Sequence, residues 1–212
     1  MRLEARFLIP LGAFLLAAVP VAAQDARLGR LDPATGEIVA RLVDSARAAS
    51  LPSEPLVDKA LEGVSKHAPG ARIAEAVRAL LADLGRAHGA LGGGSEAELT
   101  AGAAALRAGV APAALGELPR VRGTAALSVP LATLADLVSR GVPVATAQEV
   151  VVALAARGVS DAGYVELRRV VEADIGAGVP PAAAASVRAH GGRPPDKVVP
   201  PGKARAPGQL RR

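Results

Sequence analysis

The feature that most constrains the fold of this sequence is a helix stop that recurs in its second half. Residues 134–171 read as three amphipathic segments joined by two similar turns, Arg140-Gly141-Val142-Pro143 and Arg157-Gly158-Val159-Ser160. Glycine just past a helix adopts the left-handed conformation that other residues avoid, and the apolar residue after it packs back on the last turn. Pro143 then suits a first helical position, Ser160 suits an N-cap, and the arginine that opens each turn complements the helix dipole. This stretch predicts short helices that pack against one another.

The same glycine–valine pair recurs beyond this stretch. Four glycines are followed by valine, at spacings of 32, 17 and 20 residues: Gly109, Gly141, Gly158 and Gly178. Ser50-Leu51-Pro52 is a looser copy of the same turn. The spacing lacks the fixed period of roughly 33 to 45 residues that is typical of helical solenoids. Two explanations stay open: repeated use of one stop signal, or internal duplication of a helix with its turn.

Apolar residues at helical spacing predict further helices upstream. Asp32 and Pro33 suit the N-cap and first turn of a helix with one apolar face on Ile38, Leu42 and Ala46. Three later helices are marked by apolar residues three or four apart: Val57, Ala60, Leu61 and Val64; Ile73, Val77, Leu80 and Leu84; Leu99, Ala103 and Leu106.

The rest of the chain continues this pattern without a convincing strand. A short helix is expected at 113–118, a less regular link at 119–130 and a last helix at 181–190. Nowhere does apolar and polar character alternate over a convincing length, as it would in a half-buried strand. The predicted fold is all-α, with short helices joined by Gly-Val-Pro/Ser turns and packed as an irregular bundle or stack.

Composition restricts what can fill the core and what chemistry is available. Half of the residues are hydrophobic, but there are only two Phe, both within the first 14 residues, and no Trp. Tyr164 is the one later aromatic, and we expect its ring in the core and its hydroxyl at the surface. The absence of cysteine excludes disulfides, thiolate catalysis and Cys-based zinc sites.

The glycine-rich segment 91–95 is the clearest internal boundary. Three consecutive glycines do not belong inside a helix, and Ser95 with Glu98 forms a capping box for the helix that follows. No Gly-Lys-Ser/Thr follows and no strand precedes, so a hinge is favoured over a phosphate-binding loop. The expected organisation is a helical hairpin region at 24–90, this hinge, and a helical region at 96–190.

The first 23 residues have the composition of a secretory signal. Arg2 and Arg6 supply a basic start, Phe7–Val19 is an apolar run too short for a comfortable membrane span, and small residues precede Gln24. We therefore expect export to the periplasm or the extracellular space. The alternative is an uncleaved N-terminal anchor.

The last segment, 191–212, differs from the rest in composition. It contains five Pro, four Gly, six basic residues and one acidic residue, which is typical of disorder, and it holds a net charge of +5 against −1 for residues 24–190. It is expected either to be a solubilising terminus or to bind an anionic envelope polymer through its basic residues, Arg193, Lys197, Lys203, Arg205, Arg211 and Arg212. Without interleaved aromatics it makes a poor nucleic-acid platform, so no nucleic-acid partner is expected.

No catalytic or metal-binding pattern stands out. His67, His88 and His190 are isolated in sequence, none with a second ligand at the spacing that places two on one helix face. Glu96 and Glu98 are better explained by the helix dipole than as a pair of catalytic carboxylates. We therefore predict no enzyme, no cofactor and no metal.

The sequence favours an exported, non-enzymatic helical protein that acts as a binding or scaffold module for another macromolecule. The alternative is an envelope-associated structural protein tethered by its basic tail. An enzyme whose site assembles from residues distant in sequence is a third hypothesis, supported by no visible pattern.

If the first 23 residues are a cleaved signal, the mature protein begins at or near Gln24. Mass spectrometry of the protein purified from its own cells measures this directly. Recovery of a soluble form that still begins at Met1 would contradict the prediction.

Overall fold

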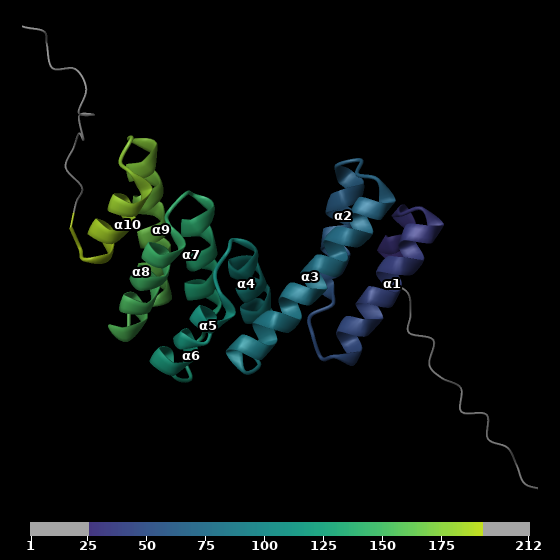
Figure 1. Ribbon diagram of the computed structural model, residues 1–212, viewed down its shortest axis with the longest axis horizontal. Coiled ribbons are helices and arrows are strands. Elements are labelled where there is room, and N and C mark those ends of the chain that lie inside the picture. Colours follow the sequence, from purple (N-terminus) through teal and green to yellow (C-terminus); the bar gives the residue numbers. More distant parts are fainter. Residues whose placement is uncertain (1–25, 193–212) are drawn as a thin grey trace, which may run out of the picture.

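The computed structural model describes residues 26–192, and its helices fall into two arms (Figure 1). The first arm contains a 3-10 helix and three α-helices: η1 (Ala26–Arg30), α1 (Pro33–Ala48), α2 (Glu54–Ser65) and α3 (Gly70–Leu91). The second contains seven: α4 (Glu96–Arg107), α5 (Pro112–Leu115), α6 (Glu117–Arg122), α7 (Ser128–Ser139), α8 (Val144–Ala156), α9 (Asp161–Gly176) and α10 (Pro181–Ala189). The described residues contain no strand, so the all-α prediction is confirmed.

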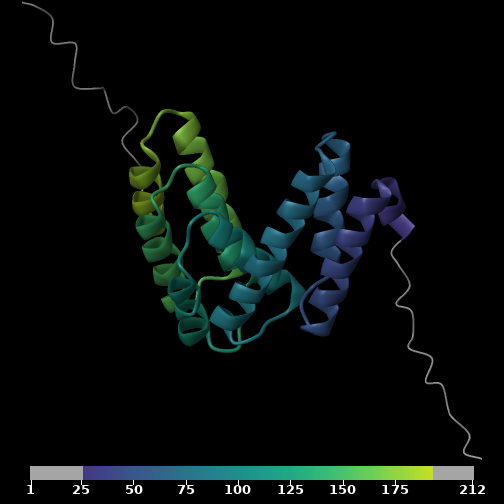
Figure 2. The ribbon, with the colours of Figure 1, turned by 45° about the vertical axis from the view of Figure 1, so that its right-hand side comes forward.

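The two arms diverge like the limbs of a V (Figure 2). Each has its own hydrophobic core. The first core is built on Val39, Leu56, Val77 and Leu84 with their neighbours. The second surrounds the buried leucines of α7, with side chains from α5, α6, α8, α9 and α10 packed on them. No helix within residues 26–192 combines the length and apolar character needed to cross a membrane.

The joint between the arms is the packing of α4 on α3. Leu91 contacts both cores, and α4 places Leu99 in the first core and Leu106 in the second. The helices can approach closely because Gly102 lacks a side chain: a Cβ there would lie 3.1 Å from the Cβ of Ala87. After α3 the chain turns through three glycines with positive φ, Gly92 to Gly94. That this segment acts as a hinge between domains stays a prediction.

The predicted helix stops share one hydrogen-bond pattern. After α8, Gly158 has φ +66°, its N–H donates to Ala155, and the N–H of Val159 donates to Leu154. This is the pair of bonds that satisfies the last carbonyls of a helix. The same pair follows six other helices, with the left-handed residue at Ser50, His67, Gly109, Gly141, Gly178 and Gly191. Ser50 therefore is the looser copy that the sequence indicated, whereas His67 and Gly191 extend the set.

The two arginines of the central turns connect helices as well as ending them. Arg157 donates a 2.6 Å hydrogen bond to the carbonyl of Ala189, the last residue of α10. Arg140 pairs with Asp136 on its own helix and with Glu172 on α9. Both turns are thus tied to helices that lie later in the chain.

Two local predictions differ from the structure, namely the buried face of α1 and the position of Pro143. On α1 the buried residues are Val39, Val43 and Ala46, while Ile38 and Leu42 flank them and stay partly exposed, because α1 faces both α2 and α3. Pro143 is the N-cap of α8, one position before the helix.

The interval 113–130 is more helical than expected. It contains α5, α6 and the start of α7 in place of one helix and an irregular link. Pro119 and Pro130 both lie in first turns, where the missing N–H leaves no hydrogen bond unmade.

Tyr164 is completely buried, including the hydroxyl that was expected at the surface. The hydroxyl donates to the carbonyl of Val151, and the guanidinium of Arg122 lies 5.5 Å from the ring centroid. Burial raises the pKa of this phenol, although the hydrogen bond and charge of Arg122 work in the opposite direction. The ring of Tyr164 is therefore a structural side chain that packs between α6, α8 and α9.

Replacement of Gly158 by valine isolates the conformational cost of a helix stop, since a Cβ at this position would meet nothing within 4 Å. Forcing a β-branched residue into the left-handed region is expected to lower the free energy of unfolding by about 1–2 kcal/mol. Asparagine tolerates this conformation, so Gly158→Asn should lose less. Urea unfolding measures both; equal midpoints and slopes for Gly158→Val and the wild type would show that Gly158 is no helix stop.

Candidate functional site

A broad groove lies between the two arms. It encloses about 1170 Å³ and is lined by residues of α2, α4, α7 and α9. Two smaller cavities lie elsewhere: one of about 540 Å³ beside η1, and one of about 300 Å³ between α8, α9 and the end of α10.

The floor of the groove consists of small apolar side chains on α4 and α7. On α4 and its C-cap they follow the helical spacing of one face, Ala97, Ala101, Ala104 and Ala108, and on α7 they are Val129, Ala132 and Ala135. The large side chains of the same helices point the other way, into the cores. Helices on a protein surface normally carry charged residues on their outer face. This outer face is apolar instead.

The walls add a charged rim and one large apolar side chain. Val165 of α9, which is 54% exposed, and Pro55 of α2 both belong to the lining. Acidic residues of the α2 wall, Glu54 and Asp58, contact Arg27 of η1. On the opposite wall, Arg168 lies 2.9 Å from Asp136.

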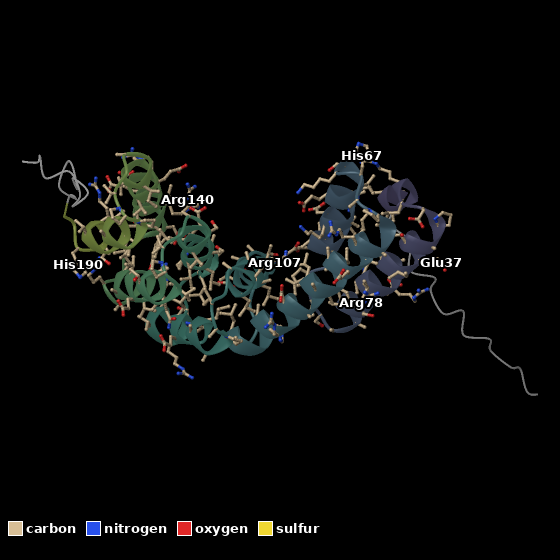
Figure 3. All side chains as sticks on the ribbon, turned by 45° about the horizontal axis from the view of Figure 1, so that its top comes forward. Glu37, His67, Arg78, Arg107, Arg140 and His190 are labelled. Atoms are coloured by element: carbon tan, nitrogen blue, oxygen red, sulfur yellow. The ribbon has the colours of Figure 1, made fainter. Side chains whose placement is uncertain are left out.

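Ion pairs fix the positions of the rim residues. Arg107 at the end of α4 lies between the arms (Figure 3) and contacts Asp83 of α3 at 3.1 Å. Burial works to raise the pKa of Asp136, but hydrogen bonds from Arg140 and Arg168 outweigh it, so that the pKa lies below its ordinary value. The arginines at the rim are therefore neutralised by carboxylates of this chain.

Glu98 holds the two floor helices together at their N-termini. Its carboxylate accepts hydrogen bonds from the N–H of Ser95 and from the N–H of Leu127, both at 2.8 Å. With the bond from Ser95 to the N–H of Glu98, this completes the capping box that the sequence predicted. The N–H groups of Leu127 and Ser95 lower the pKa of Glu98 from its ordinary value of 4.5, although burial opposes them.

The candidate chemical residues of the sequence do not come together. His67 and His190 lie in different arms (Figure 3), and His88 is exposed in the last turn of α3. Within the part of the chain that the structure describes, no three His, Asp or Glu side chains are placed to hold a metal ion. The six basic candidates Arg193, Lys197, Lys203, Arg205, Arg211 and Arg212 lie outside the described residues, as does the expected signal.

The groove was not predicted from the sequence, although a signal for it exists. Six of the twelve residues from Ala97 to Ala108 are alanine, and the two charged ones, Glu98 and Arg107, stand near the ends. A helix that is apolar all around its circumference, with charges confined to its ends, is typically covered on both sides. The alanine-rich composition hid this pattern because alanine also favours helices wherever it occurs.

Comparisons with known proteins returned no match: no protein-family model fits the chain, and no curated protein or solved structure is significantly similar to it.

Protonation of Glu98 should loosen the floor of the groove. Because its pKa is lowered in the folded protein, its contribution to stability is present above pH 4.5 and is lost as the pH falls through the folded pKa. Urea midpoints of the wild type should exceed those of Glu98→Gln at pH 7, and the gap should narrow at pH 3. Glu96, two residues earlier, is exposed, so Glu96→Gln is the control whose urea midpoint should change little. A gap independent of pH would contradict this assignment.

Proposed function

We propose that this chain is an exported, non-enzymatic binding module whose groove holds a helical segment of another protein. The observation that carries the proposal is the outward-facing apolar floor formed by α4 and α7. Contiguous exposed apolar surface rimmed by polar residues is typical of interaction sites. A floor of alanines leaves room for the larger apolar side chains of an amphipathic helix, which is a recurring mode of peptide recognition.

The charges of the lining favour a protein partner over a nucleic acid. Four acidic residues and two arginines line the groove, and both arginines contact carboxylates. Phosphate backbones are bound through surplus lysine and arginine, which this groove lacks. The apolar floor, by contrast, gains from contact with leucine-sized side chains in proportion to the area removed from water.

A tryptophan in the floor should block the groove without disturbing the core. Ala104 is exposed in the groove, and Ala82 is an exposed alanine of α3 outside its lining. The wild type and Ala82→Trp should capture the same proteins from the native extract, and Ala104→Trp should fail to capture them. Quantitative mass spectrometry of the captured proteins measures the difference. Capture of the same set by Ala104→Trp would place the binding surface elsewhere.

A second candidate function rests on the distribution of charge. The segment 191–212 holds a net charge of +5, whereas residues 24–190 sum to −1. Such separation suits an envelope-associated protein that is tethered to an anionic polymer by its tail. The groove and the tail use different parts of the chain, so both functions are compatible in one molecule.

Deletion of 193–212 tests the tether and spares Gly191 and Gly192, which end α10. The shortened protein should keep its helical content yet elute from anionic envelope material at low salt. The full chain should elute only as salt rises and the screening length falls below about 10 Å. Equal retention of the two forms at low salt would rule out the tail as tether.

A further inference from the structure

We infer that the helix held in the groove is about three turns long, has large apolar side chains at heptad spacing, and carries a lysine or arginine in its last turn that pairs with Glu96 of the lining. This inference rests on the proposed function and names the chemistry of the partner at the same site. It also assigns a direction to the bound helix, antiparallel to α4 and α7. The lining of the groove supplies the evidence for each feature.

Both floor helices present their groove-facing residues at coiled-coil spacing. On α4 and its C-cap the positions are four, three and four residues apart: Ala97, Ala101, Ala104 and Ala108. On α7 they are three, four and three residues apart: Val129, Ala132, Asp136 and Ser139. Alternating steps of three and four residues keep one face of a helix in contact with a neighbouring helix. A partner with the same repeat therefore contacts both floor helices along their length.

The floor also sets the length of the partner and the size of its side chains. Helices α4 and α7 have 12 residues each and extend about 18 Å, and both contribute lining residues from their first turn to their end. A helix of about three turns covers this length. Because the floor is built mainly from alanines, the partner supplies the large side chains, whose burial removes apolar area from water.

The two floor helices begin at the same end of the groove. Glu98, in the first turn of α4, accepts a hydrogen bond from the N–H of Leu127, the N-cap of α7. The helices pack side by side from there in parallel orientation (Figure 1). Their dipoles consequently place partial positive charge at this end. A third helix is favoured when its C-terminus, with partial negative charge, lies at the same end, so the partner runs antiparallel to both.

Glu96 is the carboxylate that the partner meets at this end. It lines the groove in the first turn of α4, is exposed, and forms no ion pair with any residue of 26–192. The other three carboxylates of the lining contact arginines of this chain. A lysine or arginine in the last turn of the partner pairs with Glu96 and also complements the partner's own helix dipole. The charge and the direction therefore agree.

The flank of the floor that carries Glu96 is polar farther along as well. Thr100, one turn beyond, lines the groove, and its hydroxyl is buried without a hydrogen bond to any residue of 26–192. Rotation about χ1 exchanges a threonine hydroxyl with its methyl group, which turns the hydroxyl toward a polar group of the partner. Val165 stands on the wall formed by the second arm. The groove thus favours an amphipathic helix.

A second copy of the chain is a poorer occupant. Within residues 26–192 the exposed large apolar side chains are Val121 and Val165, which belong to different helices, α6 and α9. No described helix therefore offers a row of exposed large side chains to the floor.

Two synthetic helical peptides test the inference with the full chain. Both have about 14 residues, two heptads with leucine at the apolar positions, and they differ only in the last turn, which holds two lysines or two glutamates. Fluorescence anisotropy should give about fivefold higher affinity for the lysine probe at low salt, because attraction to Glu96 replaces repulsion. The ratio should shrink as salt rises. Equal affinities, or no binding of either probe, would overturn the inference.

Charge reversal separates contact with Glu96 from the helicity of the probes themselves. In Glu96→Lys the lysine probe should lose about fivefold in affinity and the glutamate probe should gain. Glu75→Lys is the matched control, since Glu75 is an exposed acid of α3 outside the lining, and it should leave both affinities unchanged. Circular dichroism of both variants confirms that the helices are intact. Equal effects of the two substitutions would contradict the pairing with Glu96.

A third probe, with its two lysines in the first turn, tests the direction. It should bind the wild type more weakly than the probe with lysines in the last turn, and the difference should narrow in Glu96→Gln. Equal affinities for the wild type would overturn the antiparallel assignment. If no probe responds to Glu96 while Ala104→Trp abolishes partner capture, the inference fails and the proposed function stands. If Ala104→Trp captures the wild-type set of proteins, the proposed function fails and the inference fails with it.

Discussion

The architecture depends on the close contact between α3 and α4. At Gly102 a side chain would lie 3.1 Å from Ala87 and 3.3 Å from Leu115, so this glycine lets the two helices and α5 meet. Beside it, Leu91 packs into both cores, and each of the two helices supplies residues to both. The joint therefore connects two small cores that would each be marginal alone, because small cores bury little apolar surface. It also sets the divergence of the arms.

The groove is a consequence of this joint and of the residues on its open side. The outer positions of α4 are alanines, with Ala101 and Ala104 near the middle. If these positions held charged residues, the space between the arms would be an ordinary solvated surface. The rim is fixed by ion pairs within the protein, such as Arg107 with Asp83 and Arg168 with Asp136. A preformed apolar floor with a fixed rim reduces the ordering that accompanies binding.

Features encoded locally were predictable from the sequence, and features set by distant contacts were not. The stop at Gly158 and the capping box of Ser95 with Glu98 depend on a few consecutive residues, and both are present. The buried face of α1 and the enclosed hydroxyl of Tyr164 depend on which helices pack around them, and both were misjudged. The groove belongs to the second kind, because the sequence does not specify which of two apolar faces of α4 lacks a partner.

Unfolding of the two arms, observed separately, tests most directly whether the α3–α4 joint makes them one unit. The chain has no tryptophan, so Leu42→Trp reports on the first core and Ile175→Trp on the second; both positions are partly buried at the edge of their core. A single cooperative unit requires that urea midpoints and slopes from the two fluorescence signals coincide. We expect coincident transitions. Two separate midpoints would show that the arms fold independently and that the joint does not hold the groove in a fixed shape.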